Sequence, residues 1–186
     1  MGKLVVTEFV SLDGVMQAPG GEDFKYPGWS FAFDRGEDGN QFKLDETLET
    51  DALLIGRVTY ESFAGAWPDY EGPFADRMNA MRKVVVSNTL TDPEWTNTRV
   101  LSGDLVAGIT ELKSGDGGPI QVPGSATLVH GLLDAGLVDE LRLMVFPLSI
   151  GAGLRVFPET QKKQTWALTA TESFPSGVRV DTYHPA

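Results

Sequence analysis

The chain has 186 residues, a formal net charge of −11 and no cysteine. This length suits one domain with a sizeable core, so we expect a single domain over residues 1–186. The acidic balance argues against nucleic acid or an anionic membrane surface as a partner. Without cysteine and with two histidines, disulfides and a metal site are not expected. We find neither a cleavable leader nor an apolar run of spanning length, and therefore expect a cytoplasmic protein.

The first two thirds of the chain alternate between predicted strands and helices. β-Branched and apolar runs predict buried strands. These strands are 3–10, 52–56, 83–87, 98–101 and 119–122. Glycine, proline and Asp104 punctuate the predicted helices. These helices are 38–51, 57–63, 73–81 and 104–113, with Phe42, Leu44 and Leu48 as the inward residues of the first. Residues 15–30 form a long loop, and loops of this length are often functional.

Residues 120–148 predict a βαβ unit. A strand end turns through Pro123-Gly124 into an amphipathic helix, which Gly136 can end before a second apolar run. This is about the minimum length for a parallel crossover. The remaining predicted strands, 165–174 and 178–183, follow without helices, and residues 175–177 suit a hairpin. We therefore predict an α/β fold with a mixed, mostly parallel sheet and antiparallel C-terminal strands.

The start of the helix after Gly124 carries no acid in its first turn. Helix starts usually recruit Asp or Glu, because the helix dipole is positive there. A neutral start that is entered through glycine and contains Ser125 and Thr127 suits an external anion such as phosphate. The alternative is an ordinary structural helix with Ser125 as its N-cap.

Three predicted strand-to-helix junctions share a character: each strand ends in a small or hydroxyl residue, namely Gly56, Ser87 and Gly124. In open α/β sheets the ligand lies beyond the carboxyl ends of the strands. Arg57 begins a helix, where a cation is unfavourable against the dipole, and a bound anion would remove that conflict. Alternatively, Arg57 points into solvent or pairs with Glu61 one turn later.

Four segments, in order along the chain, resemble the dihydrofolate reductase family. The segment from Gly56 to Ser62 is similar to the Gly-Arg-x-Thr-aromatic-Glu-Ser segment of dihydrofolate reductase itself. The segment from Gly124 to Leu128, with Leu132-Leu133 and residues 136–141, resembles the second nucleotide-binding helix of its relatives. Pro147, Gly151 to Gly153 and Phe157 resemble their late loop. Ser11-Leu12-Asp13-Gly14 resembles the first loop of the reductase domain of riboflavin biosynthesis, and the nearest likeness is to bacterial dihydrofolate reductase family proteins.

This resemblance implies a three-layer αβα fold and an enzyme that uses reduced nicotinamide. The cofactor would be NADPH, with NADH possible, and the hydride would pass to a small heterocyclic substrate, pterin-like or pyrimidine-like. The related enzymes are dihydrofolate reductase and 5-amino-6-(5-phosphoribosylamino)uracil reductase. The residues implied at the cofactor are Val10, Ser11, Gly56, Arg57, Thr59, Ser87, Gly124, Ser125, Ala126, Thr127 and Leu128. Relatives in the riboflavin pathway are commonly dimers, so we expect a homodimer through the C-terminal strands, with Leu143, Val145 and Trp166 facing either the partner or the core.

Asp13 is the polar candidate beside the reacting ring, as a proton source for hydride transfer. Alternatively it is a turn residue before Gly14. Gly14 and Trp67 are the other expected substrate contacts, although Trp67 could equally close the core. Asn88 stands where the reductases usually carry the arginine that meets a 2′-phosphate, which leaves the choice of cofactor open. Because no pterin-binding carboxylate can be placed, a non-catalytic dinucleotide-binding or flavin-binding module remains the alternative function.

Overall fold

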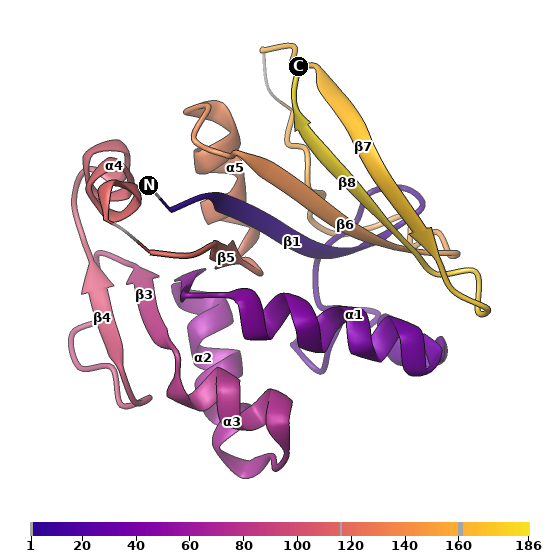
Figure 1. Ribbon diagram of the computed structural model, residues 1–186, viewed down its shortest axis with the longest axis horizontal. Helices are drawn as coiled ribbons and strands as arrows, with labels where there is room; N and C mark the ends of the chain where they lie inside the picture. Colours follow the sequence, from indigo (N-terminus) through magenta and orange to yellow (C-terminus); the bar gives the residue numbers. More distant parts are fainter. Residues whose placement is uncertain (1, 116, 160–161) are drawn as a thin grey trace.

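An eight-stranded mixed sheet forms the centre of the computed structural model, which describes residues 2–115, 117–159 and 162–186 (Figure 1). The strand order is β4-β3-β2-β5-β1-β6-β8-β7. The strands are β1 (Leu4–Ser11), β2 (Ala52–Gly56), β3 (Arg82–Val86), β4 (Thr98–Leu101), β5 (Ile120–Val122), β6 (Glu140–Phe146), β7 (Trp166–Ser173) and β8 (Arg179–Pro185). The first six in this spatial order pair in parallel, and β6, β8 and β7 pair antiparallel. The predicted fold class is confirmed.

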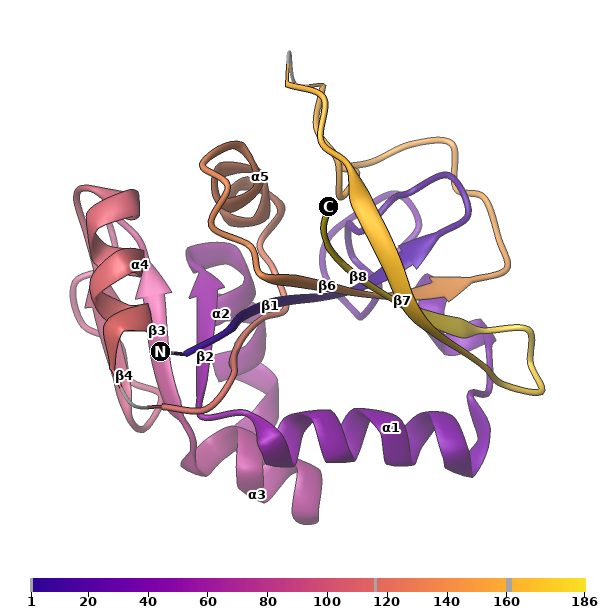
Figure 2. The same ribbon diagram turned by 45° about the horizontal axis from the view of Figure 1, so that its top comes forward.

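Helices cover both faces of this sheet, which gives three layers (Figure 2). One face carries α4 (Leu105–Ser114) and α5 (Ala126–Asp134), and the other carries α1 (Gly36–Glu49), α2 (Arg57–Ala66) and α3 (Pro73–Ala80). Two short 3-10 helices, η1 (Trp29–Ala32) and η2 (Trp67–Asp69), complete the set. In the part of the chain that the structure describes, no helix has both the length and the apolar character needed to cross a membrane.

Alternation along the parallel strands divides the core between the two faces. Leu54 and Val84 pack with α4 and α5, whereas Leu53, Ile55 and Val85 pack with α2 and α3. Successive side chains of a strand point to opposite faces, so a continuously apolar strand feeds both cores. This explains why unbroken apolar runs in the sequence predict these strands.

The predicted βαβ unit is present, and it encloses β1. β5 and β6 lie on either side of β1 and run parallel to it, so α5 crosses over β1. Gly136 adopts a left-handed conformation with φ of 66° just beyond the helix, as expected for a glycine that ends it. The hairpin between β7 and β8 is also confirmed, with Gly177 at a φ of 82°.

α1 differs from its predicted packing. Leu48 was expected to face inward but is 52% exposed, whereas Glu46 and Thr47 are buried. The reason is that α1 covers a polar part of the sheet: Lys43 forms an ion pair with Glu46 and donates a hydrogen bond to Thr7 Oγ1. Hydrophobic spacing is a poor guide to a helix that packs through charged groups.

A buried lysine stabilises the region where α3 meets β3. The side chain of Lys83 is fully buried, and its Nζ donates to the backbone oxygens of Asn79, Met81 and Thr96 at 2.7, 2.9 and 3.0 Å. It also lies 4.2 Å from the centre of the Trp95 ring. Burial lowers the pKa of Lys83 to about 8.

We expect Lys83→Met to lower the free energy of unfolding by roughly 2–4 kcal/mol, because it leaves three carbonyl oxygens, one of them in a buried hydrogen bond and two in part-buried ones, without their donor. Urea denaturation measures this. Lys25→Met is the control, since Lys25 is exposed and its loss should change stability by less than about 0.5 kcal/mol. Equal stability of the two variants would contradict the structural role of Lys83.

Candidate functional site

The candidate site lies at the carboxyl ends of the parallel strands, where β2 and β5 are neighbours. The chain leaves β2 through α2 toward β3 on one side, and leaves β5 through α5 toward β6 on the other. Adjacent strands whose connections diverge in this way form a topological switch point, and ligands of open α/β sheets bind in the crevice beyond it. Of the predicted cofactor residues, Gly56 ends β2 and Gly124 follows the end of β5 by two residues.

Glycine allows the starts of α2 and α5 to touch across the switch point. The Gly56 N–H donates to the Gly124 carbonyl oxygen at 3.2 Å. A Cβ at Gly56 would lie 2.6 Å from Ser125 Oγ, and one at Gly124 would lie 2.8 Å from Thr59 Oγ1. Gly124 also has a φ of +109°, and the Gly124–Ser125 peptide bond is cis. A side chain at either glycine would therefore push the two helix starts apart.

Ser125 caps the neighbouring helix rather than its own. The Thr59 N–H, in the first turn of α2, donates to Ser125 Oγ at 3.1 Å, and the two hydroxyls lie 3.0 Å apart. No side chain caps α5, and its first turn contains no acid. Ser125 occupies the N-cap position of α5, but its side chain does not cap that helix as the alternative expected, so the N–H groups of the first turn of α5 have no side-chain cap. In that first turn, Ala126 and Leu128 are buried and Thr127 is exposed.

Arg57, the first residue of α2, pairs with Glu61 at 2.7 Å, as one of the two alternatives expected. Both side chains are about half exposed, at 47% and 52%. Exposed pairs of this spacing are worth only about 0.3–0.5 kcal/mol. A phosphate at the helix start could therefore draw the guanidinium away from Glu61 at little cost.

Ser87 lies at the same edge but does not begin a helix, which corrects the sequence interpretation of this junction. Its hydroxyl accepts hydrogen bonds from the N–H groups of Thr89 and Leu90, so it closes a turn between β3 and β4. The neighbouring Asn88 uses its side-chain oxygen to accept from the Gly103 N–H at 3.0 Å. Ser87 is half-buried and Asn88 exposed, and both remain beside the end of β3.

Asp13 fastens the loop after β1 to a second loop near residue 150. Its carboxylate accepts from Ser11 Oγ at 2.6 Å and from the N–H groups of Ile150 and Gly151 at 3.0 and 2.8 Å. The hydrogen bond from Ser11 and those from the backbone lower the pKa of Asp13 from 3.8 to about 2. A carboxyl group with this pKa is ionised at neutral pH. The geometry therefore favours an anchoring role for Asp13 over that of a proton donor.

The remaining predicted contacts divide between this loop and the core. Gly14 has a φ of +79° and its carbonyl accepts from the Val156 N–H, so it belongs to the same loop pair. Val10 is only 3% exposed and packs in the core beneath α5. Trp67 begins η2 after the far end of α2 and packs against Phe63, Tyr70 and Phe74. The structure thus does not bring Trp67 to the switch point.

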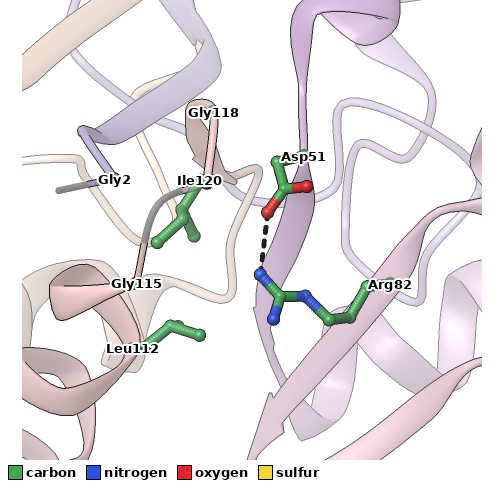
Figure 3. Close-up of a pocket in the computed structure, with 8 residues that line it drawn as sticks. Gly2, Asp51, Arg82, Leu112, Gly115, Gly118 and Ile120 are labelled. Carbon is green, nitrogen blue, oxygen red and sulfur yellow. Dashed lines mark hydrogen bonds and ion pairs between the residues drawn. The ribbon is translucent and has the colours of Figure 1, made fainter.

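Two recesses of the structure lie away from this site. A cavity of about 220 Å³ opens near the amino ends of β2 and β3, beside the ion pair between Asp51 and Arg82 (Figure 3). A second, of about 200 Å³, lies between the end of α5 and the start of β7. Neither contains a residue that the sequence predicts at the cofactor. Among the described residues, no group of three or more His, Asp or Glu side chains could hold a metal ion.

Glu8 is the polar residue of this site that the sequence interpretation missed. It is 5% exposed, and its Oε1 is buried without a hydrogen-bond partner. This atom would lie 3.9 Å from a Cβ at Gly124. Burial raises the pKa of the Glu8 carboxyl well above its ordinary value, and the charge of Lys43 opposes this only in part. The available signal was one acid inside the buried run from Leu4 to Val10.

Comparison with known proteins gives the family. The model of the RibD C-terminal domain matches residues 2–180. The chain belongs to the RibD C-terminal domain family. It is 26% identical over 188 residues to the uncharacterized protein YyaP of Bacillus subtilis (strain 168). The alignment covers 98% of this chain and 94% of YyaP.

Solved structures support the same fold. A protein from Shewanella sp. PV-4 that is assigned to riboflavin biosynthesis superposes with a TM-score of 0.81 at 21% identity, over 99% of each chain. Dihydrofolate reductase from Enterococcus faecalis, solved as a complex with NADP(H), superposes with a TM-score of 0.64 at 18% identity, over 99% of this chain and 96% of the reductase. The resemblance inferred from the motifs is confirmed for family and fold.

We expect Ser11→Ala to raise the pKa of Asp13 toward 3.8, because it removes the strongest of the hydrogen bonds that lower it. NMR titration of the carboxyl carbon measures both values. Since the folded pKa is the lower one, the stability that Asp13 contributes is present above about pH 4 and is lost as the pH falls through about 2. A wild-type midpoint near 3.8 would show that the Asp13 contacts do not persist in solution.

Proposed function

We propose that this protein is an NAD(P)H-dependent reductase of a small, heterocyclic substrate. The observation that carries the proposal is the contact between two glycine-entered helix starts at the switch point of the sheet. The start of α5 has neither an acid nor a side-chain cap, and that of α2 bears Arg57. Helix starts of this kind bind phosphate groups, and a dinucleotide carries two or three.

The residues present fit such a cofactor. Gly124 holds no side chain at the place where a pyrophosphate would approach, and the N–H groups at Ala126, Thr127 and Leu128 belong to the uncapped turn. A reduced nicotinamide supplies the hydride when bound. Membership of the RibD C-terminal family supports this choice, as does the likeness to the Enterococcus faecalis reductase in its complex with NADP(H).

Each part of the site then has a role. Gly124, Ser125 and the first turn of α5 bind the pyrophosphate, while Gly56, Arg57 and Thr59 hold a further phosphate at the start of α2. Ser87 lies beside the adenosine ribose. Ser11 borders the nicotinamide at the end of β1, and Val10, the residue before it in the strand, packs in the core. Asp13 and Gly14 position the loop that closes over the substrate, because Asp13 ties this loop to residues 150–151.

The second candidate function is a binding module without turnover, for a dinucleotide or a flavin. The low pKa of Asp13 favours it, since the expected proton donor is ionised at neutral pH. Mixing the protein with NADPH and a panel of pterins, pyrimidines and quinones, and following absorbance at 340 nm, separates the two. Turnover supports the reductase, tight NADPH binding without turnover supports the module, and a yellow purified protein supports a flavin.

We expect Thr127→Asp to weaken NADPH binding at least tenfold without destabilising the fold. An acid in the first turn of a helix stabilises it by about 0.3–1 kcal/mol through the helix dipole, but here it would repel a bound pyrophosphate. Thr127 is exposed, so the change disturbs no packing. Calorimetric titration with NADPH measures the affinity, and thermal unfolding measures the stability.

Val106→Asp is the matched control for this experiment. Val106 is 48% exposed in the first turn of α4, a helix start that Asp104 already caps with its carboxylate. This variant introduces the same acid at a helix start outside the candidate site and should keep wild-type affinity for NADPH. Equal affinity of Thr127→Asp and Val106→Asp would mean that the start of α5 does not hold the cofactor.

We further propose a homodimer through β7. Every residue of β7 after Trp166 is exposed, and β7 is the edge of the sheet. Edge strands of this kind must be covered or paired. Leu143 and Val145, at 9% and 8% exposed, fill the domain's own core, so they do not face a partner.

Light scattering should therefore give about twice the 20.2 kDa mass of the chain. Leu168→Lys, on the exposed edge strand, should shift the protein to monomer, because a charge would enter a desolvated interface. Phe31→Lys, an exposed apolar position outside β7, should leave the mass unchanged. A wild-type monomer would show that the β7 edge is left unpaired.

A further inference from the structure

Glu8 lies on the part of β1 that β5 leaves uncovered. β5 pairs with β1 only from Leu4 to Val6, opposite Ile120 to Val122. β1 continues to Ser11 with β6 on its other side. In the described part of the chain, no strand therefore pairs with β1 beyond Val6 on the side of the switch point. Glu8 sits where the two strands separate.

The side chain of Glu8 points into this opening. Its Oε1 would lie 3.9 Å from a Cβ at Gly124, and Thr59 Oγ1 would lie 2.8 Å from the same point. Glu8 therefore shares the surroundings of Gly124 with a hydroxyl group from α2. Thr59 already bonds to Ser125, whereas Glu8 Oε1 has no hydrogen-bond partner although it is buried. A buried polar atom without a partner is costly, and its position beside a candidate ligand site indicates a partner that is not part of the chain.

The charges around Glu8 leave it without an ion-pair partner. Lys43, on α1, acts on the carboxyl from across the sheet, but it pairs with Glu46 and donates to Thr7. Arg57, at the start of α2, pairs with Glu61. Leu143 is the neighbour of Glu8 on β6, and the start of α5 contributes only hydroxyl and peptide groups. An ionised carboxylate here would face a bound pyrophosphate with nothing between them to neutralise it.

We propose that Glu8 is a cofactor-binding residue that acts as a neutral acid and donates a hydrogen bond to an oxygen of the bound dinucleotide. The inference rests on the proposed function and adds a residue and a protonation state to it. The acceptor is either a phosphate oxygen or the carboxamide oxygen of the nicotinamide. In both cases the bound cofactor keeps the proton on Glu8. At a pH at which Glu8 is ionised in the free protein, binding therefore takes up one proton.

The experiment is calorimetric titration of the wild type, Glu8→Gln and Glu8→Leu with NADPH and with NADH between pH 5 and 9.5. Wild-type affinity should fall about tenfold per pH unit once Glu8 ionises in the free protein. Glu8→Gln keeps a donor that cannot titrate, so this fall should disappear while affinity at low pH is retained. Glu8→Leu should bind at least fivefold more weakly at low pH. The ligands' own titration is common to all variants, so the difference between the profiles is the readout.

Glu46→Gln is the control, because it makes the same change in a buried carboxyl that belongs to α1 and lies away from Gly124. It should keep the wild-type pH profile.

Thermal unfolding at pH 8 tests the fold. A pKa that is raised in the folded state costs stability above the unfolded pKa, so Glu8→Gln should melt no lower than the wild type. Titration with ADP-ribose identifies the acceptor, since the pH-dependent fall persists for a phosphate oxygen and is lost for the carboxamide.

Two results would overturn the inference, and they differ. In the first, the wild type binds NADPH or NADH, but the pH profiles of Glu8→Gln and Glu46→Gln are the same. Glu8 is then not the titrating contact, and the proposed function stands. If neither dinucleotide binds the wild type at any pH, the proposed function fails as well. Buffers of different ionisation enthalpy give the proton uptake of the wild type directly, so the test does not depend on any variant folding.

Discussion

The contact between Gly56 and the Gly124–Ser125 segment is the constraint on which the rest of the site depends. It joins two helix starts from opposite faces of the sheet through a backbone hydrogen bond of 3.2 Å and through the Ser125 hydroxyl. Because Ser125 caps α2, it cannot cap α5 in the same way, and one helix start stays open. The positive end of that dipole, at a switch point of the sheet, is what makes this helix start suitable for a phosphate.

Sequence patterns predicted the strands well because the parallel sheet is buried on both faces. Unbroken apolar runs such as residues 52–56 have no polar side to offer solvent, which is typical of central strands. α1 shows where the same reasoning fails. It packs through Lys43 and Glu46, and no count of apolar residues along a helix can anticipate that a charged face meets a polar patch of strands.

The candidate site was predicted at the level of segments and missed at the level of contacts. Glycine at the ends of β2 and β5 is visible in the sequence, and its position at the strand ends follows from the fold. The cap that Ser125 provides spans 66 residues to Thr59, and the anchor from Asp13 spans 138 residues to Gly151. Such long-range partners depend on how loops meet in space, which local spacing does not encode.

The carboxyl groups of Glu8, on β1, and of Asp13, in the loop after β1, show how the environment of an acid sets its chemistry. Asp13 accepts hydrogen bonds from a hydroxyl and two backbone N–H groups, and these lower its pKa to about 2. Glu8 is buried, and burial raises its pKa. Environments that separate the pKa values of two acids also separate their roles. Asp13 holds a loop as an anion, whereas burial favours the neutral form of the Glu8 carboxyl. The acid that the sequence motif highlights therefore has the contacts of a loop anchor, and the acid inside an apolar strand is the one that we propose meets a ligand.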